Sequence, residues 1–96
     1  MQMSLDSVRA EITKVDDGIL QLIARRQELA VEIAKIKNSR GMPIRDDRRA
    51  NEVIGSVFDR AVELKIDPVA TQKIFEMLIA MSEERQRGCS GEGNLP

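Results

Sequence analysis

A single long apolar stripe limits what this chain can fold into more than any other feature of its sequence. Between residues 5 and 37, apolar side chains recur at alternating spacings of three and four, the pattern of one helix face. A helix of roughly 35 residues is about 50 Å long, whereas a compact domain of this length is only about 30 Å across. Part of the stripe must therefore pack on another copy or another protein, and a homodimer is the simplest solution. The stripe consists of Leu5, Val8, Ile12, Val15, Ile19, Leu22, Leu29, Ile33 and Ile36.

A cation interrupts this stripe. Position 26 lies between Leu22 and Leu29, where the spacing predicts an apolar residue, but the residue there is Arg26. Burying an unpaired guanidinium is costly, so Arg26 is expected to face a counter-charge, a polar cavity or an anionic ligand. A surface that served only for packing would be better served by leucine.

Two shorter helices are predicted after the long one, which is expected to run from about Ser4 to Ser39. Asp46 or Asp47 can cap a second helix, and the Asp67-Pro68 pair can open a third. Since no segment shows the alternation of a strand, the predicted fold class is all-α, with one long and two shorter helices.

The third helix is expected to end at Gly88. Residues 1–88 are accordingly predicted to form one helical domain. Residues 89–96, which include two glycines, are predicted to form a disordered tail.

Composition excludes several functional classes. The chain has no histidine, and its one cysteine is Cys89, so histidine-based catalysis is excluded and a metal site of His and Cys is not expected. A formal net charge of -1 and an aromatic content of 2% argue against a nucleic-acid or membrane-surface protein. The absence of a long apolar run and of a signal-peptide pattern predicts a cytoplasmic protein without a membrane span.

Two further basic residues on the long helix are candidate ligand-binding groups. Lys37 follows Arg26 by 11 residues, which places both on nearly the same face, with Cα atoms roughly 16 Å apart, where they can hold a small anion. The alternative is that Lys37 is solvated at the helix end. Arg9 is too far from Arg26 to share a ligand within one helix, but in an antiparallel dimer Arg9 of one chain can lie level with Arg26 of the other. The alternative is that Arg9 is exposed and forms an ion pair with Asp6.

The shorter helices carry two polar pairs. Asp46 and Arg49 are three residues apart and can cap and salt-bridge each other. Ser82 and Gln86 are four residues apart and share a helix face with Phe75. They are expected either to point inward as hydrogen-bonded polar groups or to fray into solvent at the helix end.

Four stretches of the sequence resemble the all-helical chorismate mutases. The motif VDxxILxLIxxR spans Val15 to Arg26, RRQELAxEIxKxK ends at Lys37, PIxD spans residues 43–46, and the run FEMLIAMSEERQ closes the match. The resemblance covers residues 5–86. It implies an intertwined three-helix homodimer with two active sites, which converts chorismate to prephenate without a cofactor in phenylalanine and tyrosine biosynthesis.

The resemblance also implies roles for individual residues. Arg26 would bind one carboxylate of chorismate, and Arg9 would bind the other from the partner chain. Lys37 and Gln86 would hydrogen-bond the ether oxygen of the bond that breaks. No metal is implied.

The remaining implied positions surround the ring of the substrate. Ser82 matches a position near a carboxylate, and Asp46 and Arg49 match positions that organise the site near the ring hydroxyl. One residue departs from the family pattern: a glutamate that accepts the C4 hydroxyl usually follows Arg49, and this chain has Ala50. Related isochorismate-pyruvate lyases share the fold, and their substrate has its hydroxyl at another position of the ring. They are therefore the alternative enzyme class. A non-catalytic helical dimerisation or regulatory module is the alternative outside enzymes.

Overall fold

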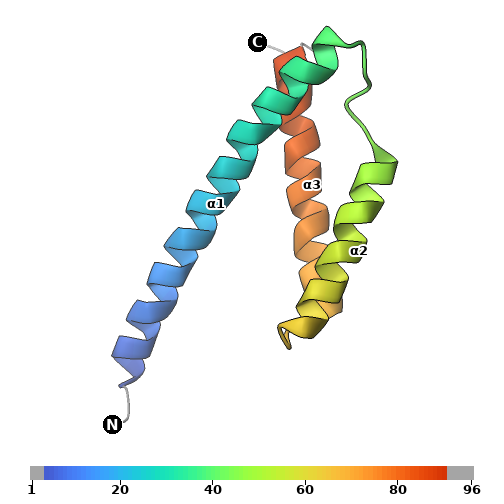
Figure 1. Cartoon of the computed structure of the whole chain (residues 1–96). Coiled ribbons are helices and arrows are strands. Elements are labelled where there is room, and N and C mark those ends of the chain that lie inside the picture. The colour runs from blue at the N-terminus through green and yellow to red at the C-terminus, as the bar shows by residue number, and fades with distance from the viewer. Residues whose placement is uncertain (1–3, 91–96) are drawn as a thin grey trace.

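The computed structural model describes residues 4–90 and contains three helices (Figure 1). Helix α1 spans Leu5–Ser39, α2 spans Asp47–Glu63 and α3 spans Pro68–Ser90. The predicted all-α class and the order of one long and two shorter helices are confirmed. The end of the third helix was predicted two residues too early, because the helix continues through Gly88 to Ser90. Residues 91–96 of the predicted tail lie outside the described residues.

Side-chain caps explain where the helices begin. The Ser4 side chain accepts a hydrogen bond from the backbone N–H of Ser7 at 3.1 Å, and Asp46 accepts one from Arg49 at 3.0 Å. Asp67 accepts bonds from the backbone N–H groups of residues 69 and 70. Each cap satisfies amide groups that have no partner inside the helix. The three predicted starts are therefore confirmed.

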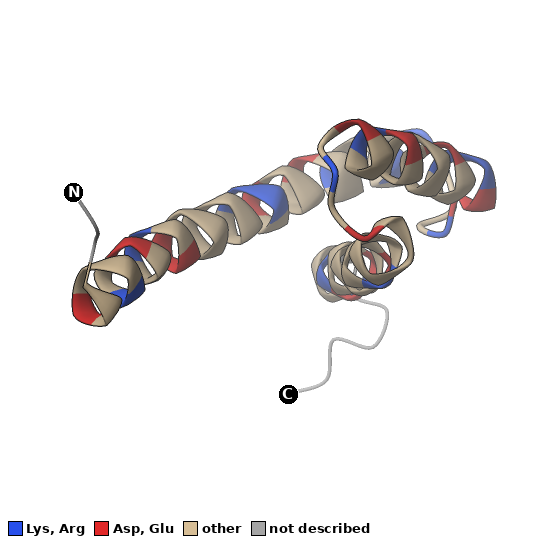
Figure 2. Ribbon diagram, turned by 90° about the horizontal axis from the view of Figure 1, so that it is seen from below, with Lys and Arg blue, Asp and Glu red and all other residues tan. Residues whose placement is uncertain are grey.

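The three helices form an elongated molecule. Helix α3 lies between α1 and α2 and packs against both, while the N-terminal half of α1 extends beyond the other two (Figures 1 and 2). The radius of gyration is 17.0 Å and the longest extent is 58 Å. A compact chain of this length has a radius of gyration of about 12.5 Å. The N-terminal half of the longest helix therefore has no neighbouring helix among residues 4–90.

Most large apolar side chains remain exposed in the single chain. Among the described residues, the buried apolar ones are Ala30, Ala34 and Ala61, which are small enough to let the helices approach closely. Every residue of the apolar stripe on α1 is exposed, from 39% at Val8 to 69% at Leu22. An apolar surface of this extent is characteristic of an interaction surface.

Charges of both signs lie on all three helices (Figure 2). Around the loop that joins α1 to α2, Lys35 pairs with Glu32, and Arg45 pairs with Asp47. These two basic residues are thus balanced by neighbouring acids. None of the helices within residues 4–90 is long and apolar enough to cross a membrane.

Candidate active site

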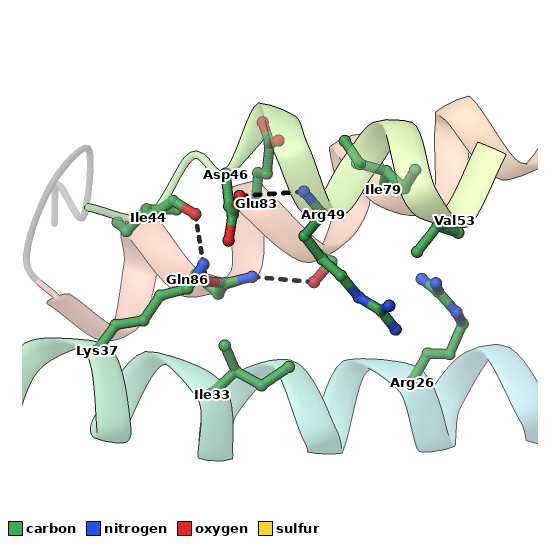
Figure 3. A pocket seen from close by; sticks show the side chains of 12 residues that line it. Arg26, Ile33, Lys37, Ile44, Asp46, Arg49, Val53, Ile79, Glu83 and Gln86 are labelled. Carbon is green, nitrogen blue, oxygen red and sulfur yellow. Dashed lines mark hydrogen bonds between the residues drawn. The ribbon is translucent and has the colours of Figure 1, made fainter. Parts of the chain in front are cut away.

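A cavity of about 220 Å³ lies where the C-terminal halves of α1 and α3 meet the start of α2 (Figure 3). Its wall combines basic, acidic and amide side chains with a few apolar ones. The lining residues are Arg26, Ile33, Lys37, Ile44, Asp46, Arg49, Ala50, Val53, Ile79, Ser82, Glu83 and Gln86. Six of the seven residues predicted from the sequence as ligand-binding groups therefore share one cavity, and Arg9 is the exception.

Lys37 is half-buried and hydrogen-bonded inside this cavity. Its ammonium donates to the side-chain carbonyl of Gln86 at 2.9 Å and to the backbone carbonyl of Ile44. Lys37 is therefore not simply solvated at the end of α1. An ammonium group has three N–H donors, so these two bonds leave one donor for a ligand.

Gln86 is buried, with only 4% of its surface exposed. Its amide nitrogen donates to the hydroxyl of Ser82 at 3.1 Å, while its carbonyl oxygen accepts from Lys37. Because an ammonium group cannot accept a hydrogen bond, Lys37 fixes which end of the amide faces it. Of the two alternatives predicted for Gln86 and Ser82, the inward orientation with hydrogen bonds is the one observed.

Arg26 is held by α3 and faces the cavity. Its guanidinium donates to the backbone carbonyl of Leu78 at 3.3 Å and lies 5.9 Å from the ring centroid of Phe75. No carboxylate among residues 4–90 forms an ion pair with it. Figure 3 shows the guanidinium groups of Arg26 and Arg49 pointing toward each other across the cavity. Two cations that converge in this way favour an anion between them.

The predicted ion pair between Asp46 and Arg49 is wrong, although the predicted cap is correct. Asp46 accepts from the backbone N–H of Arg49 at 3.0 Å. The Arg49 guanidinium instead contacts Glu52 at 3.4 Å. Since both partners are largely exposed, this ion pair adds little stability, and Arg49 is free to reorient toward a ligand.

Arg9 lies outside the cavity of its own chain. It is in the exposed N-terminal half of α1, 17 residues before Arg26, and forms no ion pair with Asp6 in the part of the chain that the structure describes. The predicted contribution of Arg9 from a second chain remains a prediction.

Sequence reasoning missed Glu83 as a cavity residue. Glu83 follows Ile79 by four residues and precedes Gln86 by three, so all three share one face of α3. That spacing could have identified it. Glu83 also acts on the loop between α1 and α2: the pKa of Arg45 is raised, first by the hydrogen bond to Asp47, then by the negative charges of Asp47 and Glu83.

Together these features define a helical protein with a small, cation-rich cavity for an anionic molecule. Residues 8–87 match the family described as chorismate mutase type II. A chorismate mutase of Methanocaldococcus jannaschii is 35% identical over 83 residues, covering 86% of this chain and 84% of that relative. The chain therefore belongs to the type II chorismate mutase family.

Two other similar proteins are a longer bifunctional enzyme and a short chain with a solved structure. A bifunctional chorismate mutase/prephenate dehydratase of Buchnera aphidicola is 28% identical over 84% of this chain, which spans only 21% of that relative. A conserved hypothetical protein of Pyrococcus furiosus has a structure that matches with a TM-score of 0.68 and 34% identity, covering 91% of this chain and 100% of that one. The fold therefore recurs both as a short chain and as part of a longer enzyme.

Proposed function

We propose that this protein is a chorismate mutase, which rearranges chorismate to prephenate in aromatic amino acid biosynthesis. The observation that carries the proposal is the hydrogen-bonded pair of Lys37 and Gln86, 2.9 Å apart, in a cavity that also holds Arg26. The reaction breaks one C–O bond and forms one C–C bond within a single molecule. It needs no protein nucleophile, so a site built only of binding groups is sufficient.

Charge complementarity supports a dianionic substrate. Three cationic and two carboxylate side chains line the cavity, so their formal charge sums to plus one. Arg26 binds one carboxylate of chorismate, and Ser82 lies beside a carboxylate. Arg9 of the partner subunit binds the other carboxylate and raises the formal charge to plus two, which matches the two carboxylates. Holding both carboxylates selects the conformer in which the reacting carbons lie close together.

Stabilisation of the transition state falls to Lys37 and Gln86. As the C–O bond breaks, negative charge grows on the ether oxygen, and both side chains have an N–H group left to donate to it. Such bonds strengthen as the charge grows, so they stabilise the transition state more than the bound substrate. Asp46 and Arg49 organise the site beside the ring hydroxyl.

An intertwined homodimer completes the site in this proposal. The exposed apolar stripe on α1 needs a covering surface, and a second copy supplies both that surface and Arg9. We expect sedimentation equilibrium to give the mass of two 10.8 kDa chains. Ile12→Asp, which places a charge in the stripe, is expected to dissociate the dimer, whereas Thr13→Asp on another face of the helix is not. A compact wild-type monomer would contradict the contribution of Arg9 from a partner.

Proton NMR of the reaction mixture tests the activity. The purified protein is incubated with chorismate and, separately, with isochorismate. We expect the resonances of prephenate to appear from chorismate alone. Salicylate and pyruvate from isochorismate, with chorismate unchanged, would assign the chain to the lyase class instead. A folded dimer that converts neither compound would contradict both enzyme assignments.

A further inference from the structure

The loop that joins α1 to α2 begins with a turn that depends on a glycine. Gly41 has a φ of +65°, in the left-handed region that residues with a side chain rarely adopt. This conformation turns the chain back at the end of α1, so that the backbone N–H of Met42 donates to the backbone carbonyl of Lys37 at 2.8 Å. The N–H of Gly41 donates to the carbonyl of Asn38 at 3.4 Å, which completes a Schellman motif. The turn is thus bonded to the backbone of the residue whose side chain lies in the cavity.

The same loop also reaches the side chain of Lys37. Two residues beyond Met42, the backbone carbonyl of Ile44 accepts a hydrogen bond from the Lys37 ammonium (Figure 3). Pro43 lies between them, and its ring restricts φ to about −65°. Two residues after Ile44, Asp46 caps α2 and holds the other end of the loop. The Ile44 carbonyl is therefore placed by a short segment that is fixed at both ends.

Two acceptors together orient the Lys37 ammonium. The side-chain carbonyl of Gln86 accepts the second bond, at 2.9 Å. An ammonium group has three N–H donors at tetrahedral angles, so one hydrogen bond leaves the group free to rotate, whereas two fix the direction of the third N–H. Helix α3 supplies one acceptor and the loop supplies the other. If the loop moved, the third N–H would lose its fixed direction although Gln86 stayed in place.

We propose that Gly41 is a positioning residue for Lys37: its left-handed turn places the Ile44 carbonyl, and that carbonyl directs the remaining N–H of the ammonium toward the ligand. This assignment rests on the proposed mutase function, in which that N–H stabilises the ether oxygen. Gly41 does not line the cavity, so it acts on the reaction only through the loop. Among the described residues, nothing lies within 4 Å of a Cβ atom built at this position. A side chain here therefore acts through the backbone conformation and not through a clash at its Cβ.

Two side chains of similar size test the turn in steady-state kinetics. Gly41→Val places a β-branched residue at a positive φ, which such residues do not tolerate, whereas asparagine is enriched there. We expect Gly41→Val to lower kcat for chorismate by about tenfold to a hundredfold, the range for a lost hydrogen bond to a charged group. KM is expected to change less, because the misdirected N–H acts mainly in the transition state. Gly41→Asn is expected to keep kcat within about threefold of the wild type, since the turn is retained.

Met42→Val is the matched control, because it places the same side chain at the next residue of the loop. Met42 is 46% exposed, does not line the cavity and does not have a positive φ. The residue before a proline favours an extended backbone, which suits valine, so we expect kcat to stay within about twofold. Circular dichroism checks the fold of each variant. If Gly41→Val is unfolded, Gly41→Ala replaces it, with a smaller loss of kcat in the same direction.

A double variant shows whether Gly41 acts through Lys37. When Lys37→Ala is already present, the group that the turn positions is gone. Adding Gly41→Val is then expected to change the residual kcat by less than about twofold, although the same substitution has a large effect in the wild type. A general disturbance of the loop would lower kcat by the same factor in both backgrounds.

Acetylation of lysines, followed by mass spectrometry, tests the positioning without any turnover. Lys37 is expected to react more slowly than Lys35 in the wild type, because its ammonium is half-buried and hydrogen-bonded, whereas Lys35 is 68% exposed. We expect Gly41→Val to raise the rate at Lys37 several-fold and to leave the rate at Lys35 unchanged. Gly41→Asn is expected to change neither rate.

Three results would overturn the assignment. Equal kcat values for the valine and asparagine variants would show that the left-handed turn has no part in catalysis. An equal loss with and without Lys37 would show that the turn acts on the site by another route. An unchanged acetylation rate at Lys37 in Gly41→Val would show that the turn does not place the ammonium. A wild type with a protected Lys37 that converts no chorismate is a different result, because it removes the proposed function and leaves the placement of Lys37 standing.

Discussion

Arg26→Ala is expected to lower kcat/KM for chorismate by about a thousandfold while the protein stays folded. Truncating one partner of a partly buried, hydrogen-bonded charge pair costs several kcal/mol, and about 4 kcal/mol corresponds to this factor. The loss is expected in KM as well as in kcat, because Arg26 holds a carboxylate in the substrate and in the transition state. Steady-state kinetics measures the loss, and circular dichroism monitors the fold.

The neighbouring arginine is the control for this substitution. Arg25 is exposed, pairs with Glu28 at 2.9 Å and does not line the cavity, so Arg25→Ala is expected to retain activity within about twofold. Arg26→Leu is expected to fold at least as well as the wild type, since it removes a half-buried cation that has no carboxylate partner in residues 4–90. If Arg26→Leu raised stability and the wild type had no activity to lose, α1 would be a packing helix of a non-catalytic module.

Lys37→Ala is expected to reduce kcat by at least about a thousandfold, with a smaller change in KM. The ammonium meets developing charge on the ether oxygen, so its removal raises the transition state more than the bound substrate. A second effect adds to the first: without Lys37, nothing fixes the direction of the Gln86 amide. Stopped incubations followed by NMR can quantify turnover at this low rate.

Lys35→Ala is the matched control, because Lys35 is two residues away, exposed, and paired with Glu32 at 3.4 Å. We expect nearly full activity in this variant. An equal loss in both lysine variants would point to a general effect of positive charge around the loop. A Lys37→Ala enzyme with normal kcat would remove Lys37 from the chemistry and leave the cavity as a binding site only.

The sequence was most informative about local structure. Ser4, Asp46 and Asp67 are capping residues whose effect extends over one helical turn, and all three predicted helix starts are confirmed. The expectation that Arg26 faces a cavity also followed from a local pattern, since one cation stood among apolar residues. Helix ends are less strictly encoded, which is why α3 continues through Gly88.

The pairing of side chains across helices could not be predicted from spacing alone. Lys37 and Gln86 are 49 residues apart, and their hydrogen bond depends on how α1 packs on α3 through small alanines. Glu83 was overlooked because an acid on a helix usually belongs to a solvated face. Arg9 lies on the part of α1 that has no neighbouring helix within residues 4–90, so its predicted role requires a second molecule.

Mixing two inactive variants tests most directly whether the protein is a mutase with sites shared between chains. Arg9→Ala and Arg26→Ala proteins are unfolded, combined in equal amounts and refolded, with wild type treated in the same way. If Arg9 acts on the partner's site, half of the dimers contain one chain of each kind, and each of these has one intact site. We therefore expect about a quarter of the wild-type chorismate mutase activity. A mixture as inactive as its two parents would contradict the shared site.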